Sequence, residues 1–362
     1  MNIWSKDAKA KVGETQMRYP LFTKGLSEAD NARPSVRAEE LETLSTAALD
    51  DPSNYVFSRD LSQAINVALI LGMPLLITGE PGTGKTELGR AIAHELDAGM
   101  PYVFETKSTS QARDLFYNFD SLGRYGAKDT GADPNPVNFI TYNALGLAIL
   151  NAFPLDKVSE FFPSGTTLHR GPKRSLVIID EIDKAPRDFT NDLLNEIARM
   201  AFRVPELGGV SSPGMDNRAE GVAAQLKPIV IITSNSERGL PDPFLRRCIY
   251  FHIPFPGPDT LKEIVATRLE GLSGASALVD DAIDLFSKIR DDQAQPLVQK
   301  KPGTAELLNW LQFLTSRGYS AESRIKTEGE IEPLLGSVYA LVKTEDDLAA
   351  LQSYIPTWCQ GG

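Results

Sequence analysis

The sequence predicts an α/β protein in which a parallel sheet lies between two layers of helices, followed by a smaller all-helical domain. Short continuous apolar runs alternate with helical patterns through roughly the first two thirds of the chain. The prolines at positions 254, 256 and 258 then mark a boundary, and only helical patterns follow them. Continuous apolar strands separated by helices are typical of parallel sheets that are covered on both faces.

The expected strands are the apolar runs at residues 74–78, 102–106, 175–180, 229–235 and 248–255. Helices are expected at 58–71, 85–96 and 189–200, where apolar residues recur at helical spacing. The second domain has such patterns at 259–272, 276–292, 304–318 and 332–343. We therefore predict an N-terminal extension at 1–52 with a helix over 35–49, a core at 53–256, a helical lid at 257–345 and a tail at 346–362.

Composition limits the classes of function. The chain has 362 residues and a formal charge of −11, which argues against global attraction to nucleic acid but leaves a local basic channel possible. Its two cysteines, Cys248 and Cys359, form no disulfide framework or zinc motif. The longest apolar stretch, 65–78, is broken by Gly72 and Pro74, so we expect no membrane span. Together with the absence of an apolar leader, this predicts a cytoplasmic protein.

A phosphate-binding loop follows the first expected strand and opens a helix. It matches the pattern G-x-x-x-x-G-K-[ST], in which glycines let backbone N–H groups point at phosphate oxygens. Lys85 is expected to neutralise the β- and γ-phosphates during catalysis, and the Thr86 hydroxyl to ligate Mg²⁺. The predicted nucleotide-binding residues of this segment are Gly79, Glu80, Pro81, Gly82, Thr83, Gly84, Lys85, Thr86 and Glu87.

Two carboxylates end the apolar run at 176–179. Strands of a parallel sheet present their carboxyl ends at one edge, so Asp180 and Glu181 are expected to meet the phosphate loop there. Asp180 is the predicted Mg²⁺ residue. Glu181 is the predicted base that orients the attacking water. Adjacent strand residues point to opposite faces, which lets one carboxylate face the metal and the other the γ-phosphate.

The strings GEPGTGKT, LVIIDEIDKAP, IITSN and LPDPFLRRC, in this order, resemble the AAA+ superfamily and most closely its MoxR branch, over about residues 53–315. The resemblance implies that Asn235 is the polar sensor 1 residue, although it could serve only as a turn residue. It also implies that Arg247 is a catalytic arginine finger, with Arg246 beside it, acting on the neighbouring subunit's nucleotide. Surface ion pairs are the alternative for both arginines.

The chain departs from the family at the lid, where Ala305 stands at the position of the sensor 2 arginine. Lys301, or its neighbour Lys300, is the candidate that would reach the phosphates instead. The segments 106–127 and 206–228 resemble family insertions near a ring pore. The aromatic residues at 116, 117 and 119 either serve that pore or pack in the core.

The resemblance implies an ATP hydrolase with Mg²⁺ that forms a ring, a hexamer, and remodels or activates partner proteins. A separate protein with a von Willebrand A domain is one such client. Two alternatives stay open at this point. One is a nucleotide-gated switch or scaffold with slow turnover, and the other is a nucleic-acid motor or a GTPase relative. The sequence leaves the preference for ATP over GTP open.

Overall fold

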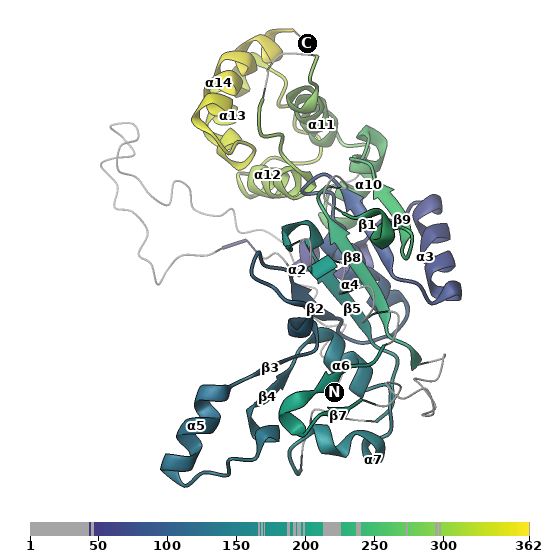
Figure 1. The fold of residues 1–362 in the computed structure, drawn as a ribbon. Helices are drawn as coiled ribbons and strands as arrows, with labels where there is room; N and C mark the ends of the chain where they lie inside the picture. The colour runs from purple at the N-terminus through teal and green to yellow at the C-terminus, as the bar shows by residue number, and fades with distance from the viewer. Residues whose placement is uncertain are drawn as a thin grey trace. The chain divides into compact units, whose positions relative to one another are not determined.

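The computed structural model describes residues 43–44, 47–165, 167, 169, 171–186, 189–190, 193, 197, 200–212, 226–236, 240–272, 274–293, 296 and 298–361. The chain divides into two compact units (Figure 1). One comprises residues 57–255 and is called the core unit here. The other comprises 1–56 and 256–362 and is called the helical unit. Most of the N-terminal extension, and of the helix expected at 189–200, lies outside the described residues.

The core unit is built on a five-stranded parallel sheet. Its strands are β1 (Leu75–Gly79), β2 (Tyr102–Glu105), β5 (Leu176–Asp180), β8 (Ile229–Ser234) and β9 (Ile249–Ile253). Their order across the sheet is β2-β5-β8-β1-β9. The predicted fold class, a parallel α/β sheet followed by a helical region, is confirmed.

Helices pack on both faces of this sheet. Alternate residues of β5 face opposite sides. Ile178 meets helix α4 (Lys85–Glu95), because a Cβ added to Gly89 of α4 would lie 2.4 Å from Ile178 Cδ1. Val177 and Ile179 instead join the buried cluster that holds Leu145 of helix α6 (Ala144–Leu150). The apolar run of β5 is continuous because each of its faces is covered by a helix.

Helix α3 (Arg59–Leu71) precedes β1, and local signals set both of its ends. The Ser58 hydroxyl accepts the N–H of Leu61 at 3.2 Å, which caps the first turn. Gly72 ends the helix in a left-handed conformation, with φ of 62°. The chain then turns directly into the strand that leads to the phosphate loop.

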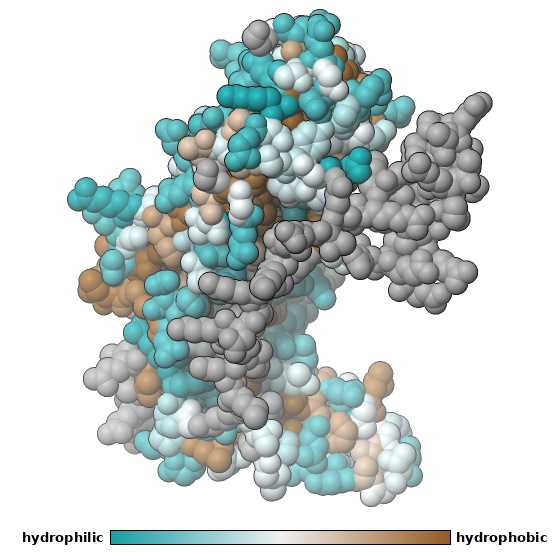
Figure 2. Space-filling view, turned by 180° about the vertical axis from the view of Figure 1, so that it is seen from behind, coloured by the Kyte–Doolittle hydropathy of each residue, from teal (hydrophilic) through white to brown (hydrophobic). Residues whose placement is uncertain are grey.

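The outer face of α3 carries exposed apolar side chains. Val67 is 44%, Ile70 83% and Leu71 58% exposed. Figure 2 is turned by 180° from Figure 1, so the side of the core unit that carries α3, at the right of Figure 1, lies at the left of Figure 2. Brown, apolar residues gather at that edge. Exposed apolar patches of this kind often mark interaction sites in soluble proteins.

A subdomain lies between β2 and β5 in the sequence. Strands β3 (Tyr117–Phe119) and β4 (Ile140–Tyr142) pair antiparallel, and helix α5 (Ser121–Thr130) connects them (Figure 1). Phe116 stacks on Phe202 with ring centroids 5.1 Å apart, and Tyr117 is 1% exposed. Of the alternatives for these aromatics, Phe116 and Tyr117 therefore pack in the core. Two large apolar side chains of α5, Leu122 and Tyr125, are exposed.

Shorter elements complete the core unit. They are helix α7 (Leu155–Val158), the antiparallel strands β6 (Arg203–Val204) and β7 (Val210–Ser211), and helix α9 (Asp242–Leu245). Part of the insertion expected at 206–228, residues 213–225, lies outside the described residues. In the described part of the chain, no helix combines the length and the apolar character that a membrane crossing requires.

The helical unit consists of packed helices. They are α2 (Ala47–Asp50), α10 (Pro258–Arg268), α11 (Ala277–Arg290), α12 (Thr304–Ser316), α13 (Ile331–Ser337) and α14 (Glu345–Gln360). Trp310 is fully buried and donates its indole N–H to Ser337 Oγ at 2.9 Å. The segment expected as a tail, 346–362, contains most of α14, whose Trp358 donates to Asp284 Oδ2 at 2.8 Å.

Candidate active site

The phosphate loop connects β1 to α4 at the carboxyl edge of the sheet. Gly79 and Gly84 have φ values of 157° and 82°, which side chains rarely allow. A Cβ on Gly79 would also lie 2.7 Å from the carbonyl oxygen of Ile253. The Thr83 hydroxyl donates to the Glu80 carbonyl at 2.9 Å and closes the turn. The loop therefore has the tight backbone curl that a phosphate cradle needs.

Lys85 lies inside this curl. It is 7% exposed, and its ammonium donates to the carbonyl oxygens of Gly79 at 2.9 Å and Glu80 at 2.7 Å. Burial lowers the pKa of Lys85, while nearby carboxylates, with Asp183 the largest contributor, oppose that shift. Neutral carbonyls compensate a buried positive charge only in part. An anion such as a phosphate would complete the compensation.

Thr86 meets the end of β5. Its hydroxyl lies 3.0 and 3.1 Å from the two carboxylate oxygens of Asp180. The Thr233 hydroxyl of β8 donates to the same carboxylate. Magnesium prefers carboxylate, hydroxyl and water oxygens, so the donor set of Thr86 and Asp180 fits that ion.

Glu181 follows Asp180 in an unusual backbone conformation. Its φ and ψ are 53° and 52°, in the left-handed region that costs a non-glycine residue about 1–3 kcal/mol. Its side chain is 39% exposed, and its carboxylate forms an ion pair with Lys184. Asn235 Nδ2 lies 3.4 Å from Glu181 Oε1. The structure therefore brings Glu181 and Asn235 together, although their strands are far apart in sequence.

Asp183 connects the loop after β5 to the end of β8. Its Oδ1 accepts the backbone N–H of Asn235 at 3.0 Å and the hydroxyl of Ser234 at 3.1 Å. These bonds fix the backbone of the residue whose side chain contacts Glu181. We assigned no role to Asp183, Lys184 or Thr233 from sequence. The partners of Asp183 and Thr233 lie about fifty residues away on another segment, and the contact of Lys184 depends on the left-handed turn at Glu181.

The remaining predicted site residues lie elsewhere or make other contacts. Glu87 pairs with Arg90 at 3.1 Å on the first turns of α4. Arg246 and Arg247 follow α9 and are exposed. Lys301 belongs to the helical unit, where its Nζ pairs with Asp292 Oδ1 at 2.7 Å. The roles assigned to the arginines and to Lys301 stay predictions.

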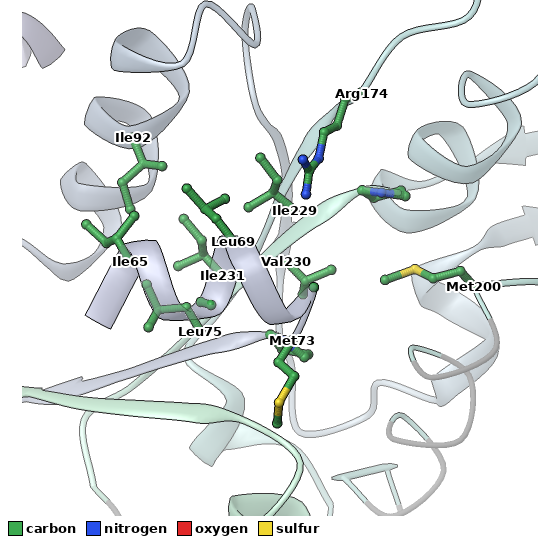
Figure 3. Close-up of a pocket in the computed structure, with 14 residues that line it drawn as sticks. Ile65, Leu69, Met73, Leu75, Ile92, Arg174, Met200, Ile229, Val230 and Ile231 are labelled. Atoms are coloured by element: carbon green, nitrogen blue, oxygen red, sulfur yellow. The ribbon is translucent and has the colours of Figure 1, made fainter. Parts of the chain in front are cut away.

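An apolar cavity lies at the opposite edge of the sheet, beside the first residues of β1 and β8. Its volume is about 20 Å³, and the side chains of α3, α4 and the strands surround it (Figure 3). Arg174 lies at this cavity, with its Nε donating to the carbonyl of Lys227 at 2.9 Å. A cavity of this size has room for about one water molecule. It is therefore separate from the phosphate loop and too small for a nucleotide.

Comparison with known proteins agrees with this geometry. Residues 74–248, just under half of the chain, match the AAA domain of the dynein-related subfamily. The matched segment begins at the first strand and ends just after the two arginines, so it contains the phosphate loop, the acidic strand end and Asn235. The match and the observed fold support an AAA+ ATPase, and the MoxR branch stays a prediction.

Two individual proteins are similar over larger parts of the chain. CD-NTase-associated protein 6 of Pseudomonas aeruginosa is 24% identical over 200 residues, which is 55% of this chain and 54% of that protein. The chain thus spans about half the length of this relative. Among solved structures, a mutant of RuvB from Thermotoga maritima has a TM-score of 0.39 and 17% identity, over 84% of this chain and 77% of that one.

Proposed function

We propose that this chain is a Mg²⁺-dependent ATP hydrolase that works as a ring, a hexamer, and uses hydrolysis to remodel a partner protein. The observation that carries the proposal is the convergence of Lys85, Thr86, Asp180, Glu181 and Asn235 at one edge of the sheet. The phosphate loop follows β1, the two acidic residues end β5, and Asn235 follows β8, so groups from three strands meet at this edge. Thr86 contacts Asp180, and Asn235 contacts Glu181. Few functions other than phosphoryl chemistry use this combination.

Each side chain has a specific task in this proposal. Lys85 and the loop N–H groups bind the β- and γ-phosphates, and Thr86 and Asp180 hold Mg²⁺. A bound Mg²⁺ would neutralise charge on the phosphate oxygens. Glu181 accepts a hydrogen bond from the attacking water and draws its proton as the γ-phosphate bond breaks. Asn235, whose Nδ2 lies 3.4 Å from that carboxylate, would also contact the γ-phosphate.

The test of catalysis is Glu181→Gln, which preserves the shape of the side chain and removes its basicity. We expect phosphate release to fall by about 10²- to 10⁴-fold, while binding of a fluorescent ATP analogue is retained. The control is Lys85→Ala, which should lose nucleotide binding itself. Hydrolysis by Glu181→Gln at the wild-type rate would show that the base is misassigned. Competition with GTP in the same binding assay decides whether the protein prefers adenine or guanine nucleotides.

The ring has its own test, because the proposed finger, Arg247, acts on the nucleotide of a neighbouring subunit. Arg247→Ala and Glu181→Gln should each be inactive alone. In a mixture, Arg247 of a Glu181→Gln subunit can serve the intact Glu181 of its neighbour, so some activity should return. A mixture that stays inactive while mass photometry detects mixed rings would contradict action in trans. The same mixing experiment with Arg246→Ala decides whether the adjacent arginine shares this role.

The partner that we propose is another protein. The MoxR resemblance suggests a client with a von Willebrand A domain, and the name of the Pseudomonas relative describes that protein as associated with another protein. The exposed apolar residues on α3, Val67, Ile70 and Leu71, are consistent with contact to another chain. We expect a genuine client to raise the rate of ATP turnover.

The ion pair between Glu181 and Lys184 favours a second candidate function. A carboxylate that is already in an ion pair takes a proton from water less readily, so ATP turnover would be slow. Slow turnover suits a nucleotide-gated switch or scaffold. In that case ATP would assemble the ring in the Glu181→Gln variant and in wild type alike, and a partner would bind without accelerating turnover. Measuring turnover with and without the client separates the two functions.

A further inference from the structure

The hydroxyl of Thr233 lies between the two acidic residues of the site. Thr233 is 1% exposed, on the central strand β8. Its hydroxyl donates to the Asp180 carboxylate and accepts the backbone N–H of Glu181 at 2.9 Å. A hydroxyl has one proton to donate and lone pairs to accept with. The single Thr233 side chain therefore contacts the predicted metal residue and the predicted base at once.

The strand register explains this placement. Strands β5 and β8 pair with Ile179 beside Ile232, so the next residues along, Asp180 and Thr233, are neighbours at the carboxyl edge. On its other side, Thr233 pairs with Ile77 of β1, two residues before the phosphate loop. A side chain at this position is thus enclosed between the strand that carries the acids and the strand that carries the loop.

The bond to Glu181 acts on a strained point of the backbone. Glu181 adopts φ of 53°, which a non-glycine residue keeps only where its surroundings hold it. Two backbone bonds do so here. The Glu181 N–H donates to Thr233 Oγ1 at 2.9 Å, and the Glu181 carbonyl accepts the N–H of Lys184 at 2.9 Å. Without the first bond, the Glu181 N–H would lose its acceptor in a partly buried region.

We propose that Thr233 is a positioning residue for ATP hydrolysis. Its hydroxyl orients the Asp180 carboxylate toward Thr86 and holds the Glu181 backbone in the conformation that presents its side chain. The expected effect on ATP hydrolysis rests on the proposed function. The expected effect on the Glu181 backbone rests on the geometry alone. It predicts that one buried hydroxyl controls both the Mg²⁺ requirement and the turnover rate.

The test uses variants that differ by the hydroxyl and little else. Thr233→Val keeps the shape and loses the hydroxyl, and Thr233→Ser keeps the hydroxyl. Thr233→Ala compared with Thr233→Ser gives a second such pair if the valine variant folds poorly. The matched control is Thr106→Val at the same edge of the sheet. The Thr106 hydroxyl is buried without a hydrogen-bond partner among the described residues, so the control loses no bond.

The kinetic test compares the effect of each variant on kcat with its effect on ATP affinity. A misplacement of about 1 Å can cost about 10²-fold in rate, so we expect Thr233→Val to lower kcat by roughly 10- to 100-fold. Its ATP affinity should change by less than about fivefold, and half-maximal activity should need more Mg²⁺. Thr233→Ser should recover most of kcat, and Thr106→Val should match wild type. Equal kcat in Thr233→Val and wild type, or equal losses in the valine and serine variants, would overturn the proposal.

Amide hydrogen exchange tests the same contact without any hydrolysis. A peptide that covers residues 176–184 should exchange more slowly in wild type and Thr233→Ser than in Thr233→Val and Thr233→Ala. If wild type hydrolyses no ATP, the proposed function fails, and the exchange data still decide whether Thr233 holds the Glu181 backbone. If hydrolysis is normal but exchange is the same in all variants, the proposed function stands and the role of Thr233 is wrong.

Discussion

Helix α4 can bring Thr86 to Asp180 only because Gly89 has no side chain. A Cβ at Gly89 would lie 2.4 Å from Cδ1 and 2.7 Å from Cγ1 of Ile178, which is fully buried on β5. Gly89→Ala should therefore push the helix away from the sheet. Since α4 begins at Lys85, the displacement would separate Thr86 from Asp180 and weaken Mg-nucleotide binding.

The size of the effect follows from two opposing contributions. Alanine in place of glycine stabilises a helix interior by about 1 kcal/mol. Overpacking a buried site costs about 1–3 kcal/mol. The net loss of unfolding free energy should therefore be about 0–2 kcal/mol. The control is Gly126→Ala in α5, where an added Cβ meets nothing within 4 Å and only the helix gain remains.

The measurement is urea unfolding by circular dichroism, together with calorimetric titration of Mg-ATP. Ile178→Val alone should cost about 0.5–1.5 kcal/mol, because it deletes a buried methyl group. Combined with Gly89→Ala, it removes the atom closest to the new Cβ, so the double variant should lose less than the sum of the singles. If Gly89→Ala gains as much stability as Gly126→Ala and binds Mg-ATP normally, the packing argument is refuted.

Two further predictions concern Lys184 and Cys248. Lys184 and Glu181 are partly exposed, so Lys184→Gln should change turnover by less than about fivefold, measured by phosphate release; complete inactivation would show that the pair has a larger role. Burial raises the pKa of the Cys248 thiol from 9.0 to about 12, so the folded core holds that proton more tightly than the unfolded chain. Unfolding free energy should therefore decline as pH rises from about 9 toward 12, and less steeply in Cys248→Ala; equal slopes in urea unfolding would contradict this.

The aromatic residues of the insertion show where sequence patterns leave alternatives open. The sequence left two interpretations of Phe116 and Tyr117, a ring pore or core packing, because aromatic residues occur in both. In the folded chain Phe116 stacks on Phe202, and the Tyr117 hydroxyl donates to Glu206 at 2.8 Å. Those partners lie about ninety residues away in sequence, so no local pattern could choose between the alternatives.

Strand order is a second case. Apolar runs at 74–78, 175–180 and 229–235 predicted buried strands, and the structure confirms a parallel sheet. A run of apolar residues reports that both faces are covered, but it carries no information on which strand is the neighbour. The placement of β8 between β5 and β1 was therefore not predictable from the pattern. That placement brings Asn235 to Glu181.

By itself the sequence determined the parts of the site that are local. Each of these parts is a motif of a few adjacent residues: the glycines around Lys85, the carboxylates at 180 and 181, and the apolar strands before them. Only the tertiary structure decided the contacts of Thr233, Asp183 and Lys184. The contacts of Thr233 and Asp183 depend on strand register, and the contact of Lys184 depends on the left-handed turn at Glu181. Register and turn geometry arise from the packing of the whole sheet, which a linear motif does not encode.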